Sequence, residues 1–244
     1  MYGGHLLFDT YDSYGEIRVL AQGEKRLLSF GPGDEQSAGF TKTPHALVFD
    51  YTQAMLLSLL FVEPKKVLLL GLGAGSLATC LHHHYARSQL TVVELRQCVI
   101  DVAYRYFGLP RSKRLTVHCG EALDTLQGLT GQYDIIFSDI YLQEGMHHSQ
   151  RNATYIEACA RHLKPEGLLV TNCWREHQED NEVLSLLQER FAAVNTCTTP
   201  DNNWLIFARQ ASLEVQNSHK EKAKLLSKQL GFSLFKHLKR FQRA

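Results

Sequence analysis

The chain has 244 residues, of which 44% are hydrophobic and 21% are charged, so it can bury a substantial core and is too apolar for a disordered protein. Its 26 Lys and Arg residues nearly balance 25 Asp and Glu residues, which excludes an overall attraction to nucleic acid or membrane. The longest apolar stretch, residues 46–62, contains Asp50 and Gln53 and predicts a core helix, with no transmembrane segment.

The six cysteines indicate a reducing compartment. No two of them are spaced as C-x-x-C, and none has a histidine at zinc-finger spacing. Most fall in predicted helices and strands, where a free cysteine behaves as a small buried hydrophobe. The N-terminus lacks the basic and apolar regions of a signal peptide. We therefore expect a cytoplasmic protein.

Residues 1–43 are predicted to form a small β segment. Glu16–Leu20 and Arg26–Phe30 flank a Gly-containing turn, which is typical of a hairpin. The sequence Gly31-Pro32-Gly33-Asp34 then interrupts the chain. A helix is predicted over Pro44–Leu60, because proline fits the first turn of a helix.

From Lys66 onward, apolar runs alternate with helical stretches. Continuous apolar runs are typical of strands buried on both faces, and their alternation with helices predicts a parallel sheet covered on both sides. The strand-like runs are Val67–Leu70, Leu90–Val93, Leu115–Val117, Ile135–Phe137 and Leu168–Val170. The helical stretches are Ser76–His84, Gln97–Phe107, Ala122–Leu129, Ala153–Leu163 and Asp180–Phe191.

Two final strand-like runs, Ala192–Cys197 and Trp204–Ala208, have no helix between them. The residues that join them are rich in turn formers, which predicts an antiparallel hairpin. A terminal hairpin on a mostly parallel, doubly wound sheet is typical of the methyltransferase-type Rossmann-like α/β fold. We expect this domain over residues 44–210, between the N-terminal β segment and a C-terminal tail, residues 211–244.

Glycines at positions 71, 73 and 75 form a G-x-G-x-G turn after the first of the parallel strands. Gly71, Gly73 and Gly75 permit a tight turn and a close approach of the backbone to a ligand. The helix that follows offers free N–H groups to an anion. Position 76 is Ser, where the dinucleotide motif has glycine. The alternative is an ordinary strand-to-helix turn.

Three carboxylates follow the next three strands, at the edge where ligands bind to an open parallel sheet. Glu94 can accept hydrogen bonds from both hydroxyls of a ribose. Glu121 can accept from an adenine amino group, or it can serve only as a helix cap. Asp139 can take a proton from an attacking nucleophile, or it can cap a turn. The pattern favours a nucleotide-binding cleft.

These segments, in this order, resemble those of the spermidine synthases, the polyamine aminopropyltransferases. The similarity covers roughly residues 10–209. It implies that an aminopropyl group moves from decarboxylated S-adenosylmethionine to an amine acceptor, releasing methylthioadenosine. The segments that carry it are Val67–Gly75, Val93-Glu94-Leu95, Gly120-Glu121-Ala122, Tyr133–Asp139, Asp34–Ser37 and Leu163–Gly167.

The resemblance also implies roles for single residues. Gln36 contacts the sulfonium end of the co-substrate, Glu94 holds the ribose, and Glu121 holds the adenine. Asp139 orients and deprotonates the attacking amine. This role fits the chemistry, because an alkylamine with a pKa of about 10 is mostly protonated at neutral pH. A carboxylate in a desolvated cleft helps to produce the neutral nucleophile.

Two aromatic residues are candidates for substrate binding. The helix that contains Tyr51 fits the layout of the family. Tyr141 belongs to the polar loop 141–152, which follows Asp139 and can cover the site as a lid. Glu144, His147 and His148 of this loop are also available for substrate contact. A solvated loop without such contacts is the alternative.

Two positions depart from the family pattern. Ala74 and Leu142 stand where the family has Asp residues that hold ammonium groups of the substrates. An alanine at position 74 also tolerates the carboxylate of intact S-adenosylmethionine, which an Asp would repel. An S-adenosylmethionine-dependent methyltransferase and a non-catalytic nucleotide-binding protein therefore remain alternatives.

The other signals are a histidine run, a basic tail and the N-terminal hairpin. Three consecutive histidines on a helix, His82-His83-His84, cannot converge on one ion, so no metal site is expected.

The C-terminal tail is basic and amphipathic. From His219 onward it contains eight Lys and Arg residues and one Glu, and Gly231 divides its amphipathic pattern into two pieces. We expect a helix packed on the body, with an anionic partner as the alternative. The N-terminal hairpin suggests a homodimer.

Overall fold

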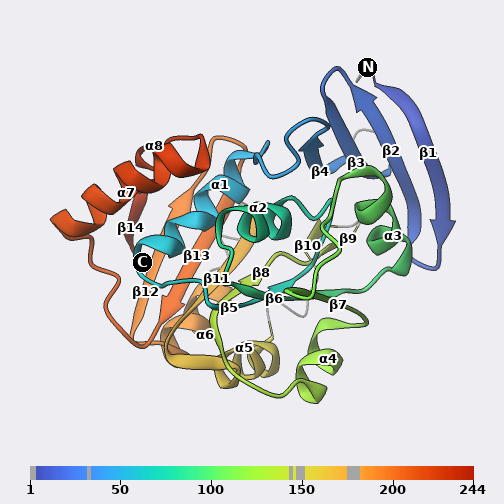
Figure 1. Cartoon of the computed structure of the whole chain (residues 1–244). Helices are drawn as coiled ribbons and strands as arrows, with labels where there is room; N and C mark the ends of the chain where they lie inside the picture. Colours follow the sequence, from blue (N-terminus) through green and yellow to red (C-terminus); the bar gives the residue numbers. More distant parts are fainter. Residues whose placement is uncertain (1–3, 32–33, 143–144, 147–151, 175–181) are drawn as a thin grey trace.

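The computed structural model contains two β-sheets, with helices on both faces of the larger one (Figure 1). An antiparallel sheet of four strands is built from the first 40 residues. The larger sheet has eight strands in the order β14-β12-β13-β11-β8-β5-β6-β7. The structure describes residues 4–31, 34–142, 145–146, 152–174 and 182–244.

The N-terminal sheet follows the chain order β1-β2-β3-β4. Its strands are β1 (His5–Asp12), β2 (Gly15–Gln22), β3 (Lys25–Gly31) and β4 (Asp34–Phe40). The predicted hairpin corresponds to β2 and β3. The outer strands lie within the predicted β segment, but they were not located individually, because β1 has an exposed face throughout and β4 contains few β-branched or aromatic residues, the types that favour strands.

The mostly parallel sheet with a terminal hairpin is confirmed. The neighbours β5 and β6, β6 and β7, β5 and β8, and β8 and β11 all pair in parallel. The hairpin strands pair antiparallel with each other, and β13 pairs antiparallel with β11. The strands are β5 (Lys66–Leu70), β6 (Gln89–Glu94), β7 (Leu115–Cys119), β8 (Tyr133–Ser138), β11 (Leu163–Trp174), β12 (Ala193–Thr198) and β13 (Asn203–Arg209).

Helices cover the sheet in two layers (Figure 1). The segment α1 and the helix α2 lie on one face, while α4, α5 and α6 lie on the other face with Leu68, Leu70 and Ile136 of the strands in their core. The helix α3 packs against β2 of the N-terminal sheet. Their bounds are α2 (Ser76–His84), α3 (Gln97–Tyr106), α4 (Ala122–Gly128), α5 (Ala153–Arg161) and α6 (Glu182–Arg190).

The helix predicted over Pro44–Leu60 is shorter than expected. The helix α1 covers Asp50–Met55 and continues as a 3₁₀ helix over Leu56–Leu60. Phe49, just before α1, has the extended conformation φ −87°, ψ 141°, which excludes it from the helix. The side chain of Gln53 donates a hydrogen bond to the carbonyl of Leu47 (3.0 Å). This carbonyl of the non-helical segment is therefore satisfied without a helix.

The tail is an integral part of the larger domain. It forms α7 (Asn217–Leu230), α8 (Phe235–Leu238) and β14 (Phe241–Arg243), and β14 pairs antiparallel with β12 at the sheet edge. Gly231 ends α7 with φ 79°, so the expected split is confirmed. The predicted domain boundary at residue 210 would therefore divide the strands of one sheet between two parts of the chain.

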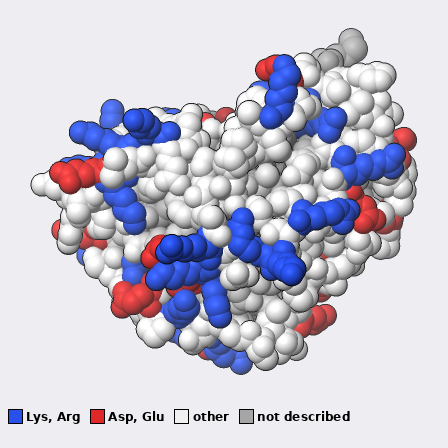
Figure 2. Space-filling model, viewed as in Figure 1, with Lys and Arg blue, Asp and Glu red and all other residues white. Residues whose placement is uncertain are grey.

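The expected packing of the tail helix on the body is also confirmed. Leu226 and Leu230 of α7 are buried in the core that includes α1, while Leu225 is 71% exposed. Lys236 forms an ion pair with Asp50 of α1 (2.6 Å). Lys and Arg side chains gather over α7 and α8 on the solvent side (Figure 2).

All six cysteines are free. Four are buried, as expected for most of them, whereas Cys98 is half-buried and Cys119 is exposed. Among the described residues, no helix combines the length and the apolar character that crossing a membrane requires.

Candidate functional site

A cavity of about 400 Å³ opens at the carboxyl ends of β5, β6, β8 and β11. The strand β5 lies between β6 and β8, so the connections of the sheet reverse direction here, which is where open α/β sheets bind ligands. All predicted site residues except Gly75 line the cavity. Those that do are Gln36, Tyr51, Gly71, Gly73, Glu94, Glu121, Asp139 and Tyr141.

The first two glycines of the turn are required by close packing. Gly71 has φ 95°, and a Cβ at this position would lie 2.9 Å from the carbonyl carbon of Asp139. Its N–H donates to the carbonyl of Val93 (2.8 Å). A Cβ at Gly73, which has φ 55°, would meet the side chain of Ser37 at 3.2 Å. The turn therefore brings backbone to the cavity wall between β5, β6 and β4.

Gly75 and Ala74 face away from the cavity. Gly75 precedes the first residue of α2 with φ 76°, and a Cβ there would lie 2.8 Å from Cδ1 of Leu109. Its role is thus conformational, and the interpretation of Gly75 as a contact residue is not supported by its position. Ala74 is 1% exposed and belongs to the apolar cluster that contains Val19 and Val99. The glycine turn contributes no carboxylate to the cavity.

Glu94 is buried and binds the glycine turn itself. Its Oε2 accepts a hydrogen bond from the N–H of Leu72 (3.0 Å), and its Oε1 accepts from the N–H of Arg96 (2.9 Å). Burial raises the pKa of Glu94, although these backbone hydrogen bonds and the charge of Arg96 oppose the shift. A carboxylate has about four acceptor sites, so Glu94 can still accept from ribose hydroxyls.

Arg96 connects this part of the site to the N-terminal sheet. Its guanidinium is buried, pairs with both carboxylate oxygens of Asp12 (2.9 and 3.0 Å) and lies over the ring of Phe30 (4.6 Å to the centroid). Phe30 lines the cavity. The N-terminal sheet thereby closes one side of the site.

Glu121 caps a helix and also lines the cavity. It is the N-cap of α4, because its Oε2 accepts a hydrogen bond from the N–H of Asp124 (2.9 Å). It also lines the cavity, and the strands β5 and β6 lie between its strand, β7, and the strand of Asp139, β8. The cap fixes the orientation of the carboxylate at the N-terminus of α4.

Asp139 lies at the centre of a hydrogen-bond network. Its Oδ1 accepts from the side-chain amide of Asn172 (2.8 Å), and the phenol of Tyr51 donates to the same carboxylate. Burial raises the pKa of Asp139, while the hydrogen bonds from Asn172 and Tyr51 oppose the shift. Burial together with the charge of Asp139 raises the pKa of Tyr51 well above its ordinary value, so the phenol remains the donor.

The outer wall of the cavity, formed by β11 and the hairpin β12–β13, contains residues that were not predicted from the sequence. Asn172, Trp174, Asp201 and Asn203 all line the cavity. Asn203 donates to Oδ1 of Asn172 (3.1 Å), which extends the network of Asp139 to the hairpin β12–β13. Asn172 follows the apolar run of β11, so the rule that pointed to the ends of the other strands could have found it. The hairpin residues carry no comparable signal.

Tyr141 is placed against this wall. Its hydroxyl donates to the carbonyl of Asn172 (3.2 Å), and its ring stacks on Trp174 with 5.6 Å between centroids. Tyr141–Leu142 (β9) pairs antiparallel with Gly145–Met146 (β10). Glu144, His147 and His148 lie outside the described residues.

Sequence comparisons relate the chain to one family of enzymes. Residues 50–215 match the sequence model of the spermine/spermidine synthase domain. The chain is 27% identical over 235 residues to a polyamine aminopropyltransferase of Vibrio vulnificus, with 92% of this chain and 79% of that protein aligned. It is also 36% identical over 86 residues to the eEF1A lysine and N-terminal methyltransferase of Mus musculus, which covers 34% of this chain and 12% of that protein.

Solved structures share the fold. A probable spermidine synthase from Corynebacterium glutamicum aligns with a TM-score of 0.78 and 22% identity over 97% of this chain and 89% of that chain. Human methyltransferase-like protein 13 in complex with SAH aligns with a TM-score of 0.68 and 22% identity over 75% of this chain and 93% of that chain. One fold thus serves proteins of both kinds.

Proposed function

Because the chain belongs to the spermine/spermidine synthase family of transferases, we propose that it transfers an aminopropyl group from decarboxylated S-adenosylmethionine to an amine. The observation that carries this proposal is the carboxylate of Asp139, which lines the cavity between Tyr51 and Asn172. A carboxylate in this position can accept the proton that an ammonium group must lose before it attacks.

The adenosyl part of the co-substrate would occupy the side of the cavity formed by β5, β6 and α4. Glu94 would accept from the ribose hydroxyls and Glu121 from the adenine amino group. Gln36 of β4 would face the sulfonium. This arrangement is supported by the position of all three side chains on one cavity, whose volume of about 400 Å³ suits a small ligand.

The transfer itself needs a neutral amine and accurate positioning. The proton of the acceptor ammonium passes to Asp139, and the free electron pair of its nitrogen attacks the aminopropyl carbon bonded to sulfur. The new C–N bond forms as the C–S bond breaks, and the electron pair of the C–S bond stays on sulfur, so that neutral methylthioadenosine leaves. Since the sulfonium is already an activated leaving group, the main contribution of the protein is orientation.

The acceptor would lie against the outer wall of the cavity. Leu142 replaces a family carboxylate, but Asp201 places a carboxylate on the cavity wall from the hairpin β12–β13. Trp174 and Tyr141 offer stacked rings, which can attract a cation through their faces. We therefore infer an acceptor with a second ammonium group, directed toward Asp201.

Methyl transfer from intact S-adenosylmethionine is the second candidate. The described cavity wall carries no carboxylate from the glycine turn, so nothing in this turn would repel the carboxylate of intact S-adenosylmethionine. The similarity to a lysine methyltransferase of Mus musculus points in the same direction, although it covers 34% of this chain.

Calorimetry with the full chain separates these functions. Decarboxylated S-adenosylmethionine should bind more tightly than the intact molecule. Mass spectrometry of reactions with a panel of diamines should detect methylthioadenosine together with an aminopropylated amine. Tighter binding of intact S-adenosylmethionine, with S-adenosylhomocysteine as product, would assign methyl transfer. Binding without any product across the panel would assign a non-catalytic role.

Exposed residues and cysteines support proposals for the oligomeric state, the compartment and a binding partner. Leu6, Leu7 and Tyr11 of β1 are exposed, which supports a homodimer formed through the N-terminal sheet. Six free cysteines support a reducing compartment such as the cytoplasm. The basic surface over α7 and α8 offers a contact for an anionic partner (Figure 2). Sedimentation analysis of the wild type and of a Tyr11→Glu variant tests the dimer.

A further inference from the structure

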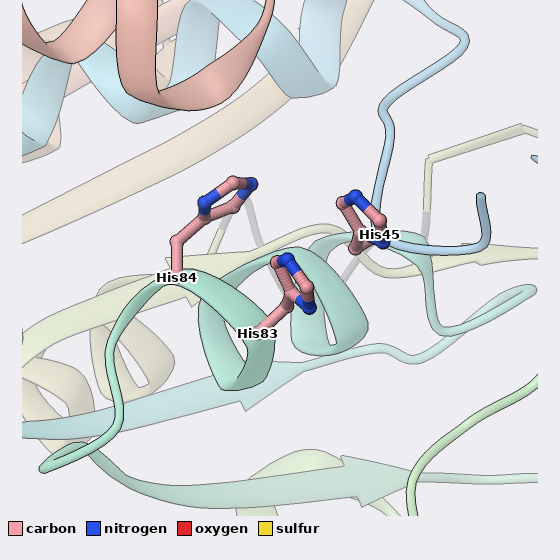
Figure 3. Close-up of side chains that lie close together, drawn as sticks. All are labelled: His45, His83 and His84. Atoms are coloured by element: carbon pink, nitrogen blue, oxygen red, sulfur yellow. The ribbon is translucent and has the colours of Figure 1, made fainter.

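Three histidines from two separate segments lie together at the end of α2. His83 and His84 are the last residues of α2, and His45 comes from the segment that precedes α1 (Figure 3). One ring nitrogen of each lies within 4.8 Å of the others. The rings of His45 and His83 are stacked with 3.7 Å between centroids, and the ring of His84 is nearly perpendicular to both.

The segment that carries His45 is held in place by its neighbours. The N–H of Ala46 donates to the carbonyl of Thr43 (2.9 Å), which makes a tight turn around His45. Pro44 packs against Gly108, where a Cβ would lie 3.2 Å from the proline ring. The third imidazole is thus fixed beside α2 by packing of the loop, at a sequence distance of 38 residues from His83.

The surroundings of His84 also suit a bound cation. The Nε2 atom of His84 is buried and has no hydrogen-bond partner within the described part of the chain. An unpaired buried polar atom costs free energy, which a ligand at this position would recover.

We propose that His45, His83 and His84 form a binding site for a divalent transition metal ion, with Zn²⁺ as the best candidate. Three imidazoles without thiolate or carboxylate match the nitrogen donors that Zn²⁺ takes in three-histidine sites, where the fourth position holds water. Hard cations such as Mg²⁺ and Ca²⁺ prefer oxygen ligands, so they are excluded by the donor set.

Binding of one Zn²⁺ ion by the three histidines requires only side-chain movement. Two nitrogens bound to one tetrahedral Zn²⁺ at about 2.0–2.1 Å lie roughly 3.3 Å apart, against the present limit of 4.8 Å. His83 is exposed, so its ring can turn out of the stack toward the ion. The sequence argument against a metal remains valid for the run of three neighbours, because His82 is directed elsewhere and contacts Arg114. It missed His45, which comes from another segment.

A metal here would connect three parts of the domain. The loop of His45 leads directly into α1, which carries Tyr51, and α2 begins at the glycine turn. The tail also reaches the cluster, since Gln229 of α7 donates to the carbonyl of His84 (3.3 Å). The ion would therefore brace the scaffold behind the cavity without taking part in its chemistry.

Isothermal calorimetry of the metal-free full chain with ZnCl₂ tests the site. We expect one ion per chain, and more than about tenfold weaker binding in each of the variants His45→Gln, His83→Gln and His84→Gln. Zn²⁺ should also raise the melting temperature of the wild type, because an ion that binds only the folded chain stabilises it. Replacing Zn²⁺ with Co²⁺ should give the visible absorption of a tetrahedral nitrogen site.

Two control variants separate the cluster from other metal-binding groups. His5→Gln removes an exposed histidine of β1, and Cys119→Ser removes the exposed thiol; both should bind Zn²⁺ like the wild type. His83→Gln keeps the test valid if the other two variants unfold, because its exposed side chain is not needed for the fold. Equal Zn²⁺ affinity of the wild type and His83→Gln, or loss of binding in Cys119→Ser, would overturn the proposal.

Discussion

The Cα atom of Gly71 packs directly against the carbonyl of Asp139. A Cβ at position 71 would lie 2.9 Å from the carbonyl carbon of Asp139 and would overlap with its oxygen. The N–H of Asp139 in turn donates to the carbonyl of Leu70 (2.8 Å). The proposed base and the glycine turn are therefore positioned by each other, because neither backbone can move without the other.

Replacing Gly71 with Ala should destabilise the protein and abolish nucleotide binding. The change combines the backbone overlap at Asp139 with a φ of 95° that L-residues rarely adopt, so a loss of about 2 kcal/mol or more in the free energy of unfolding is expected. Urea unfolding measures it. Gly128→Ala is the matched control, since a Cβ there meets nothing within 4 Å and should be neutral or slightly stabilising. Equal effects of both changes would contradict this account.

Asp139→Asn should lower turnover by about 10²- to 10⁴-fold and leave the affinity for the co-substrate nearly unchanged. The amide keeps the size of the side chain but cannot accept the proton of the acceptor ammonium. Single-turnover kinetics and calorimetry separate the two effects. Asp124→Asn, which changes an exposed carboxylate of α4, should retain wild-type activity. An Asp139→Asn variant with undiminished turnover would exclude the role as base.

Tyr51→Phe should move the acidic limb of the pH–rate profile to higher pH. The hydrogen bond from Tyr51 lowers the pKa of Asp139 against the effect of burial, so its loss raises that pKa further. The base must be ionised to act, and activity is lost as pH falls through its pKa. Profiles of kcat/KM for both proteins measure the shift. A limb that stays in place, or moves to lower pH, would show that the phenol does not hold the carboxylate.

Asp201→Asn should weaken the use of diamine acceptors. An exposed ion pair of this kind contributes about 0.4–1 kcal/mol, so KM should rise about two- to fivefold. A monoamine of similar length has no second ammonium group and should show the same KM with both proteins. Initial rates over a range of acceptor concentrations test this. An equal rise in KM for both acceptors would place the second ammonium group elsewhere.

His237 should make the stability of the protein fall in mild acid. It is fully buried on α8, and burial together with the charge of Lys236 lowers its pKa from 6.5 to about 4. The unfolded chain therefore binds a proton below pH 6.5 that the folded chain refuses until about pH 4. Across this window the free energy of unfolding should fall by up to about 1.4 kcal/mol per pH unit.

His237→Phe isolates this effect from other titrating groups. The variant should show a flatter pH dependence than the wild type between pH 6.5 and 4, whatever its stability at pH 7. Urea unfolding at several pH values measures both slopes. Parallel slopes would mean that His237 does not titrate between the folded and unfolded states.

The fold and the cavity residues at the ends of β6, β7 and β8 were predictable because their signals are local. Apolar runs such as Val67–Leu70 indicate strands that are buried on both faces. Such runs are followed, at one edge of the sheet, by Glu94, Glu121 and Asp139. The bounds of α2 match the prediction because the glycine turn sets where this helix begins.

The remaining parts depend on contacts between segments that are distant in sequence. Asn203 reaches the site through Asn172, 31 residues earlier, and nothing in the sequence near Asn203 indicates this pairing. The helix α1 begins later than Pro44 suggests because Pro44 packs on Gly108 within the tight turn from Thr43 to Ala46 and opens no helix there. The burial of Ala74 in an apolar cluster could not be predicted either, since its place in the glycine turn does not indicate it.

The strand β14 gives the larger sheet its outer border. Without Phe241–Arg243, the backbone groups of β12 that now pair with β14 would form an open sheet edge. Such edges recruit strands from other chains, and a short border strand with exposed Gln242 and Arg243 discourages that recruitment. The strand β14 thus protects the sheet against intermolecular strand addition, and its removal should first lower the solubility of the protein at high concentration.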